Sequence, residues 1–197
     1  LTKEDFDAAK SLLRFGQLPE LIVDDEPPIV QSKAILRYVG RLTHTYPSRE
    51  PIHAASVDQW VELHSEFMFS LVMNMYPDRY GLSWTDADKR MHREWCVKTH
   101  IPKYLHYLDD EVAESDTFLG YMGDVSIADF CWLPTLQWLK SGTFDGIDAS
   151  HFDGYKHLLE YMSRLRSVLE EEDRIETDDT VTDECENTGE SKEKKML

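Results

Sequence analysis

The sequence predicts an α+β fold that is mostly helical, with a short strand–strand–helix unit at its N-terminal end and an all-helical region after it. Two short apolar runs, at about residues 20–23 and 28–30, are separated by a polar turn that contains proline. The apolar spacing that follows predicts a helix at about residues 32–43. Residues 43–51 are rich in turn-forming residue types, and beyond them the apolar periodicity is purely helical. We therefore expect two domains that meet near residue 45.

The remaining elements follow from apolar spacing and from residues that end helices. Residues 1–13 are expected to form a short helical segment ahead of the strands. Pro77 ends the first long helix, because proline cannot continue one, and Pro102 is expected to kink the second. The long helices are expected at about residues 53–74, 85–112, 126–140 and 151–169.

The composition limits the class of protein and the kinds of partner. The 197 residues are 41% hydrophobic and include five tryptophans, which is enough for a sizeable core. A formal net charge of −17 argues against nucleic acid or an anionic membrane as a partner. No apolar run approaches roughly 18 residues, so no membrane span is expected. Three widely spaced cysteines, Cys96, Cys131 and Cys185, fit a reducing, cytoplasmic compartment better than a disulfide framework.

Part of the negative charge is concentrated near the C-terminal end. Residues 170–197 contain 12 acidic and 4 basic residues, a net charge of −8, and very few apolar side chains. This composition predicts a disordered acidic tail. The chain begins at Leu1 rather than Met, so a targeting segment upstream of it stays open.

Residues 14–38 carry the pattern that points to a function. Gly16-x-x-Pro19 leads into the first strand, and Gln31-Ser32 opens the helix that follows the second. A helix N-terminus offers free backbone N–H groups and the positive end of the helix dipole, which suit a carboxylate. The Gln amide and the Ser hydroxyl add neutral donors for the α-amino-acid end of a ligand. The alternative is an ordinary helix start with Ser as its N-cap.

These residues resemble the glutathione-binding half of cytosolic glutathione S-transferases, nearest the sigma and mu-like classes. Phe-Gly-Gln-Leu-Pro at 15–19 is similar to the family's loop before a cis-proline, and residues 30–38 are similar to its Gln-Ser element and helix. Lys10 matches a family lysine, whereas Phe6 stands where the family has Trp. The resemblance resumes at residues 123–130 and covers most of the chain before the acidic tail.

The resemblance implies both a domain organisation and a binding site. Residues 1–45 would be a partial thioredoxin-like, glutathione-binding domain, and residues 46–169 would be the all-helical C-terminal domain of a glutathione S-transferase. A cis Leu18–Pro19 bond would turn the backbone N–H and C=O of Leu18 toward the cysteinyl backbone of glutathione. The implied glutathione-binding residues are Lys10, Gln17, Leu18, Gln31, Ser32 and Glu66, with Pro19 in a structural role.

Each of these residues has an implied partner on the ligand. Gln31 and Ser32 would hold the γ-glutamyl carboxylate and amine. Lys10 would pair with the glycyl carboxylate, and Gln17 would contact the same end of the tripeptide. Glu66 would meet the glutamyl ammonium of glutathione on a neighbouring subunit, and its alternative interpretation is a surface carboxylate.

Two further patterns have structural rather than catalytic meanings. Ser126-Ile127-Ala128-Asp129 has the form of a capping box, in which Asp129 stands where Glu or Gln is usual, and it marks a helix start. The eight histidines show no metal-ligand spacing. His92 and Cys96 are four residues apart but lack a third ligand, so no metal site is expected.

The expected function is glutathione transfer, in which the thiolate of glutathione attacks a hydrophobic electrophile. The family's catalytic Tyr or Ser lies on a first strand that would precede residue 1, so no catalytic residue is named in this chain. The alternative is a scaffold or binding subunit of this fold with reduced or no activity, in a larger assembly. A homodimer is expected because the resembling family forms symmetric dimers. The first long helix also carries more apolar residues than a single narrow core stripe needs, namely Val57, Trp60, Val61 and Phe67.

Overall fold

The N-terminal part of the protein is a short strand–strand–helix unit. The structure, a computed structural model, describes residues 2–47, 49–114, 118–120 and 123–186. Strands β1 and β2 are antiparallel, with Glu20 opposite Val30 and Leu21 opposite Ile29. The elements of this unit are α1 (Lys3–Ala9), a 3₁₀ turn (Lys10–Leu12), β1 (Glu20–Leu21), β2 (Ile29–Val30) and α2 (Ser32–Leu42).

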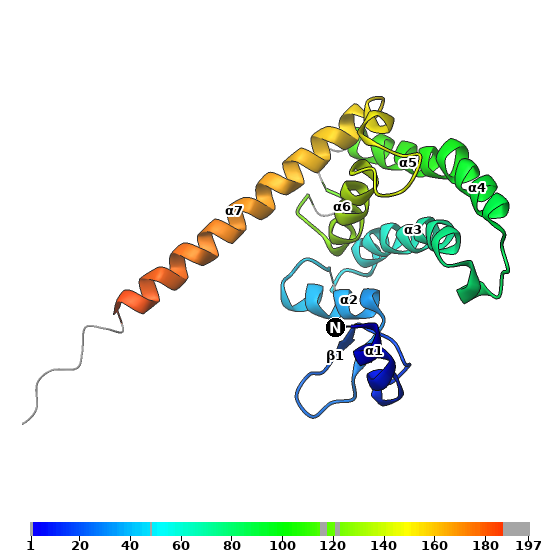
Figure 1. Ribbon diagram of the computed structural model, residues 1–197. Coiled ribbons are helices and arrows are strands. Elements are labelled where there is room, and N and C mark those ends of the chain that lie inside the picture. Colours follow the sequence, from blue (N-terminus) through cyan, green and yellow to red (C-terminus); the bar gives the residue numbers. More distant parts are fainter. Residues whose placement is uncertain (1, 48, 115–117, 121–122, 187–197) are drawn as a thin grey trace, which may run out of the picture.

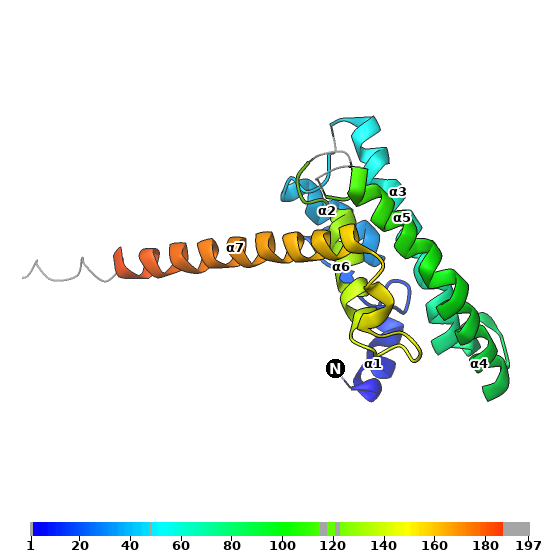
Figure 2. The same cartoon turned by 90° about the horizontal axis from the view of Figure 1, so that it is seen from above.

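The rest of the described chain is helical, so the predicted fold class is confirmed. Figure 1 shows α2 between the strands and the helical region, and both views show α7 leaving the other helices and projecting away from them (Figures 1 and 2). The long helices are α3 (Pro51–Met75), α4 (Asp86–Trp95), α5 (Ile101–Glu114), α6 (Ile127–Lys140) and α7 (Lys156–Glu186).

Helix α6 is the buried centre of the helical region. Trp132, Leu136 and Leu139 are fully buried on it, as expected for a helix surrounded by others. The indole Nε1 of Trp132 donates to the backbone oxygen of Trp60 on α3 at 2.9 Å. This bond satisfies a buried donor and fixes α6 against α3.

The apolar residues of α3 are used within the chain itself. Val57, Val61 and Phe67 are fully buried and Trp60 is 7% exposed, and all four belong to the core shared with α5, α6 and α7. The expectation that these residues leave an apolar surplus for a second subunit is therefore wrong. Phe67, for example, packs against the rings of Tyr104 on α5 and Trp132 on α6, so one chain covers more than a narrow stripe of α3.

The helix predicted at 85–112 is divided into two. A π-helical turn, Cys96–His100, separates α4 from α5. Pro102 lies just inside α5 and has no backbone N–H, so the carbonyl four residues earlier loses its usual α-helical partner. A widened turn is a common response to such an interruption. The expected kink is thus a π-turn immediately before the proline.

The last helix is longer than the sequence patterns indicated. Disorder was predicted from residue 170, whereas α7 continues to Glu186. Residues 156–186 contain neither Gly nor Pro, and extending a formed helix is easier than starting one. The part of the predicted tail at 187–197 lies outside the described residues.

Helix α2 is held closely against the helical region. A Cβ atom on Gly40 would lie 2.5 Å from Cγ2 of Ile127, so only glycine permits this approach of α2 to α6. Arg37 of α2 forms ion pairs of 2.7 Å with both Asp58 and Glu62 of α3. These contacts hold the middle and the C-terminal end of α2 against α3 and α6.

Candidate functional site

Lys10 lies against Gly16 in the loop before β1. Gly16 adopts a left-handed conformation with φ +62°, and an ideal Cβ atom there would lie 3.4 Å from Cγ of Lys10. The lysine side chain therefore passes over Gly16, beside Gln17, and Lys10 and Gln17 are both exposed. The Leu18–Pro19 peptide is cis, as the resemblance implied.

Pairing of the two strands brings Gln17 and Gln31 together. Because Glu20 lies opposite Val30, the residues just before β1 meet those just after β2. The side-chain amides are in contact, with Nε2 of Gln31 3.5 Å from Oε1 of Gln17. Four of the predicted residues, Lys10, Gln17, Leu18 and Gln31, thus lie around one edge of the small sheet.

Gln31, rather than Ser32, occupies the N-cap position of α2. Its φ of +76° and ψ of +114° are unusual for a residue with a side chain, and its amide makes no capping hydrogen bond. Such a conformation costs roughly 1–3 kcal/mol and is typical of functional sites. Ser32 is the first helical residue and is exposed. The alternative reading of Ser32 as an N-cap therefore does not describe this helix.

Arg14 holds this loop and the strands together, and sequence reasoning did not single it out. Its backbone N–H donates to Oε1 of Glu20 at 2.9 Å, and its Nη1 donates to the backbone oxygen of Pro28 at 2.6 Å. The loop that carries Gln17 is thereby fixed to both strands. Only the tertiary fold indicates this role, because Pro28 is 14 residues away.

The arrangement suits a short peptide with an anionic group at each end. The first turn of α2 offers backbone N–H groups and a dipole for one carboxylate, and Lys10 offers a cation for another. The backbone of Leu18, between them, can pair with an extended peptide as a strand edge does.

Glu66 lies apart from these residues. It is exposed on α3, and its Oε1 accepts a hydrogen bond from the hydroxyl of Tyr104 on α5. This contact and burial raise the pKa of Tyr104, with burial as the larger cause. Among the described residues the contact of Glu66 is with α5, not with Gln31 or Ser32.

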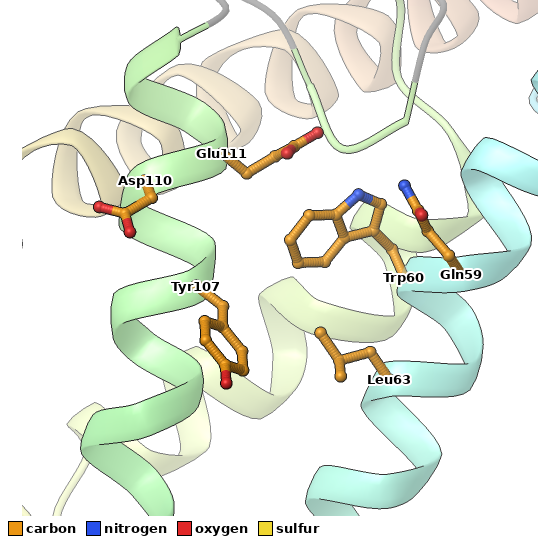
Figure 3. Close-up of a pocket in the computed structure, with 6 residues that line it drawn as sticks. All are labelled: Gln59, Trp60, Leu63, Tyr107, Asp110 and Glu111. Atoms are coloured by element: carbon orange, nitrogen blue, oxygen red, sulfur yellow. The ribbon is translucent and has the colours of Figure 1, made fainter.

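A separate cavity of about 440 Å³ opens between α3 and α5. Figure 3 shows the indole of Trp60 and the ring of Tyr107 facing this space, with the carboxyl groups of Asp110 and Glu111 at its edge. Nε1 of Trp60 is buried without a hydrogen-bond partner among the described residues. None of the predicted glutathione-binding residues lines the cavity, which is completed by Gln59 and Leu63.

Comparison with known proteins identifies the family. No family model matches the chain. The chain is 41% identical over 168 residues to glutathione S-transferase 1 of Ascaris suum, and the match covers 85% of this chain and 77% of that protein. The chain belongs to the glutathione S-transferase family. The predicted resemblance is therefore confirmed.

Solved structures show the same family fold. The structure of a glutathione S-transferase from Ascaris lumbricoides is 26% identical with a TM-score of 0.64, and the match covers 85% of this chain and 77% of that one. Prostaglandin synthase D of Nilaparvata lugens is 21% identical with a TM-score of 0.71, over 89% of this chain and 81% of that one, which shows likeness of fold alone.

The described residues contain neither a candidate metal site nor a candidate membrane span. No group of three or more His, Cys, Asp or Glu side chains there is placed to hold a metal ion. None of the helices within the described ranges is both long and apolar enough to cross a membrane.

Proposed function

We propose that this protein binds glutathione at the edge of its two-stranded sheet and transfers it to electrophilic small molecules. The observation that carries the proposal is the contact between Gln17 and Gln31 at the N-terminus of α2, with Gln31 in a left-handed conformation. The N-terminus of α2, the amides of Gln17 and Gln31, and the ammonium group of Lys10 would meet, in turn, the carboxylate, the peptide groups and the second carboxylate of a γ-glutamyl tripeptide.

The roles of the residues follow the two ends of the ligand. The γ-glutamyl carboxylate and amine are held by Gln31 and Ser32 with the helix N-terminus. The cysteinyl backbone pairs with Leu18, and the glycyl carboxylate meets Lys10 beside Gln17. We also propose that residues 1–45 and 46–169 are the two domains.

The proposed reaction forms a carbon–sulfur bond. The thiol of glutathione loses its proton, and the thiolate attacks an electrophilic carbon of a hydrophobic substrate, whose leaving group takes the electron pair. A free thiol has a pKa of about 8.5, so a transferase must favour the thiolate. No residue of this chain is assigned that task. Its residues supply binding and orientation.

The partner proposed for this chain is a second copy, as in the family to which it belongs. In such a pair Glu66, which is exposed on α3, would act on the neighbouring site. We further propose a cytoplasmic location, since Cys96 and Cys131 are free thiols.

A second candidate is a binding subunit of the same fold without transferase activity. The observation that favours it is exposed apolar surface on the N-terminal unit. Leu12, Phe15, Leu18 and Ile22 are 85%, 58%, 51% and 68% exposed around a sheet of two strands. A sheet of two strands is only marginally stable unless other protein surface packs on it. This exposed apolar surface therefore suits contact with other subunits in a larger assembly.

Two measurements distinguish the candidates. Isothermal titration of the protein with glutathione tests binding, and absorbance with a chromogenic aryl halide tests transfer. Binding together with turnover supports the transferase, and binding without turnover supports the binding subunit. An absence of binding at millimolar glutathione contradicts the proposed site.

A further inference from the structure

We propose that Lys33 is a positioning residue, which holds Gln31 and Ser32 in their ligand-binding conformation by fixing the first turn of α2 to α3. This inference rests on the proposed function. In this inference the conformation of the site depends on hydrogen bonds from Lys33 to α3. Neither Lys33 nor α3 is among the groups proposed to touch the ligand.

The anchor is a pair of hydrogen bonds between the two parts of the chain. The ammonium group of Lys33 donates to the backbone oxygen of Val61 and to Oγ of Ser65, both on α3. Val61 and Ser65 are four residues apart, so both acceptors lie on the same face of their helix. Lys33 is half-buried, and burial lowers its pKa. A cation placed there has lost part of its water and depends on these acceptors.

The conformation of Gln31 explains why an anchor is needed. A residue with φ +76° returns to an ordinary conformation unless the chain is held on both sides. Before Gln31, the pairing of Val30 with Glu20 fixes the chain. After it, the N–H groups of Ala34 and Ile35 both bond to the oxygen of Gln31, at 2.9 and 3.0 Å. That turn is held on α3 by Lys33.

Arg37 provides a natural comparison within the same helix. It also binds α3, through ion pairs with Asp58 and Glu62, but it lies one turn further from Gln31. Arg37 therefore contributes to docking of the helix as a whole, together with the close approach at Gly40. Lys33 acts on the turn that carries the site, so loss of each residue is expected to have a different effect.

Besides burial, four side chains act on the charge of Lys33: Glu62 raises its pKa and Arg37 lowers it, whereas His64 and Cys131 are shifted toward their neutral forms. His64 is half-buried, and burial, followed by the charge of Lys33, lowers its pKa to about 4. Burial also raises the pKa of the Cys131 thiol, which Lys33 opposes. Near pH 7 both neighbours are therefore neutral, and the ammonium group is directed to Val61 and Ser65.

The first experiment compares glutathione affinity with thermal stability in matched variants. Lys33→Met is expected to weaken glutathione binding about tenfold in calorimetry, whereas Arg37→Met lowers the melting temperature and changes Kd less than twofold. Lys33→Arg, which keeps a cation on a long side chain, is expected to restore at least half of the lost affinity on a logarithmic scale. Equal loss of affinity in the Met variants overturns the inference.

The second experiment does not depend on the ligand. Hydrogen exchange is measured at the amides of Ala34 and Ile35 in the protein without glutathione. Lys33→Met is expected to speed exchange at both amides about tenfold, and Arg37→Met to leave them within threefold of the wild type. Unchanged exchange in Lys33→Met shows that Lys33 does not hold this turn, whatever the protein binds.

The two experiments separate failure of this inference from failure of the proposed function. If the wild type does not bind glutathione but Lys33→Met exchanges faster at Ala34 and Ile35, the anchor is supported and glutathione is excluded as the ligand. Binding by the wild type with indistinguishable variants keeps the ligand and overturns the anchor. If Lys33→Met does not fold, Ser65→Ala removes one acceptor only. It is expected to speed the same exchange about threefold, and an unchanged rate again overturns the anchor.

Discussion

The hydroxyl of Tyr161 donates to Oδ1 of Asp129 at 2.6 Å, which joins the last helix to the first turn of the central helix. Both residues are fully buried. The same carboxyl group accepts from the backbone N–H groups of Leu119 at 2.9 Å and of Ser126 at 2.7 Å. Burial raises the pKa of Asp129, and these hydrogen bonds oppose that change. A single side chain thus connects α6, α7 and the loop before α6.

Removing the tyrosine hydroxyl is expected to destabilise the protein. Tyr161→Phe leaves Oδ1 of Asp129 with one donor fewer in a buried position, so the free energy of unfolding should fall by about 1–3 kcal/mol. Tyr155→Phe is the control, since that hydroxyl makes a longer, 3.3 Å bond to the oxygen of Pro102. Urea denaturation of both variants measures the difference. Equal urea midpoints for the two variants would show that the hydrogen bond to Asp129 stabilises the protein no more than the bond from Tyr155 does.

The capping box of α6 gives a second stability prediction. Oγ of Ser126 accepts from the N–H of Ala128 at 3.1 Å and donates to the oxygen of Leu119 at 2.6 Å. Ser126→Ala should therefore cost about 0.5–2 kcal/mol of stability, while glutathione affinity stays within twofold. Ser141→Ala, at the exposed end of the same helix, should change stability by less than about 0.5 kcal/mol. A denaturation midpoint equal to that of the wild type counts against the cap.

Glutathione affinity should depend on the hydroxyl of Ser32. Ser32→Ala removes a donor to the proposed γ-glutamyl carboxylate, and a hydrogen bond to a charged group contributes about 1–3 kcal/mol. Calorimetry should therefore show a loss of roughly five- to 150-fold in affinity. Thr43→Ala, at the other end of α2, serves as the control and should bind like the wild type. Unchanged affinity in Ser32→Ala would exclude this site.

Stability should fall in mild acid because of His64. Its Nε2 bonds to Oγ1 of Thr135 at 2.8 Å, and its Nδ1 is buried without a partner among the described residues. Burial, followed by the charge of Lys33, lowers its pKa from 6.5 to about 4. Between these values the unfolded chain binds a proton that the folded chain does not. The stabilisation present above pH 6.5 is therefore lost as the pH falls toward 4.

The size of this effect can be tested by substitution. Complete loss should be roughly 3–4 kcal/mol, since the pKa falls from 6.5 to about 4 and one pKa unit corresponds to about 1.4 kcal/mol. Thermal denaturation from pH 7.5 to 4.5 should show a smaller decline in His64→Gln than in the wild type. His106→Gln, at an exposed position, should retain the wild-type decline. Identical pH profiles for His64→Gln and the wild type would exclude His64 as the cause.

The protein should be a homodimer in solution. Two-fold homodimers are the commonest soluble oligomers, and Glu66 reaches a glutathione site only with a second subunit. Light scattering at micromolar concentration should give twice the mass of the chain. A monomeric mass would remove both the dimer and the role of Glu66 at a neighbouring site.

Local patterns in the sequence correctly predicted most of the helices and both strands. The runs before and after the polar turn gave β1 and β2, and Gln31-Ser32 marked the N-terminus of α2. Ser126 and Asp129 are three residues apart, so their capping box follows from helix geometry. Sequence patterns did not predict the π-turn before Pro102 or the helical continuation of α7 to Glu186, because residues nearby in the sequence do not specify either feature.

The amino-acid sequence by itself therefore determined the helix periods, the strand pair and the capping box. Only the tertiary structure decided that Trp60 belongs to the chain's own core, that Tyr161 meets Asp129, and that Lys33 bonds to α3 across 28 and 32 residues. The physical reason is the distance along the chain over which each kind of interaction acts. Periodicity and caps depend on residues within about one helical turn, whereas contacts between distant segments depend on how close-packed helices orient one another.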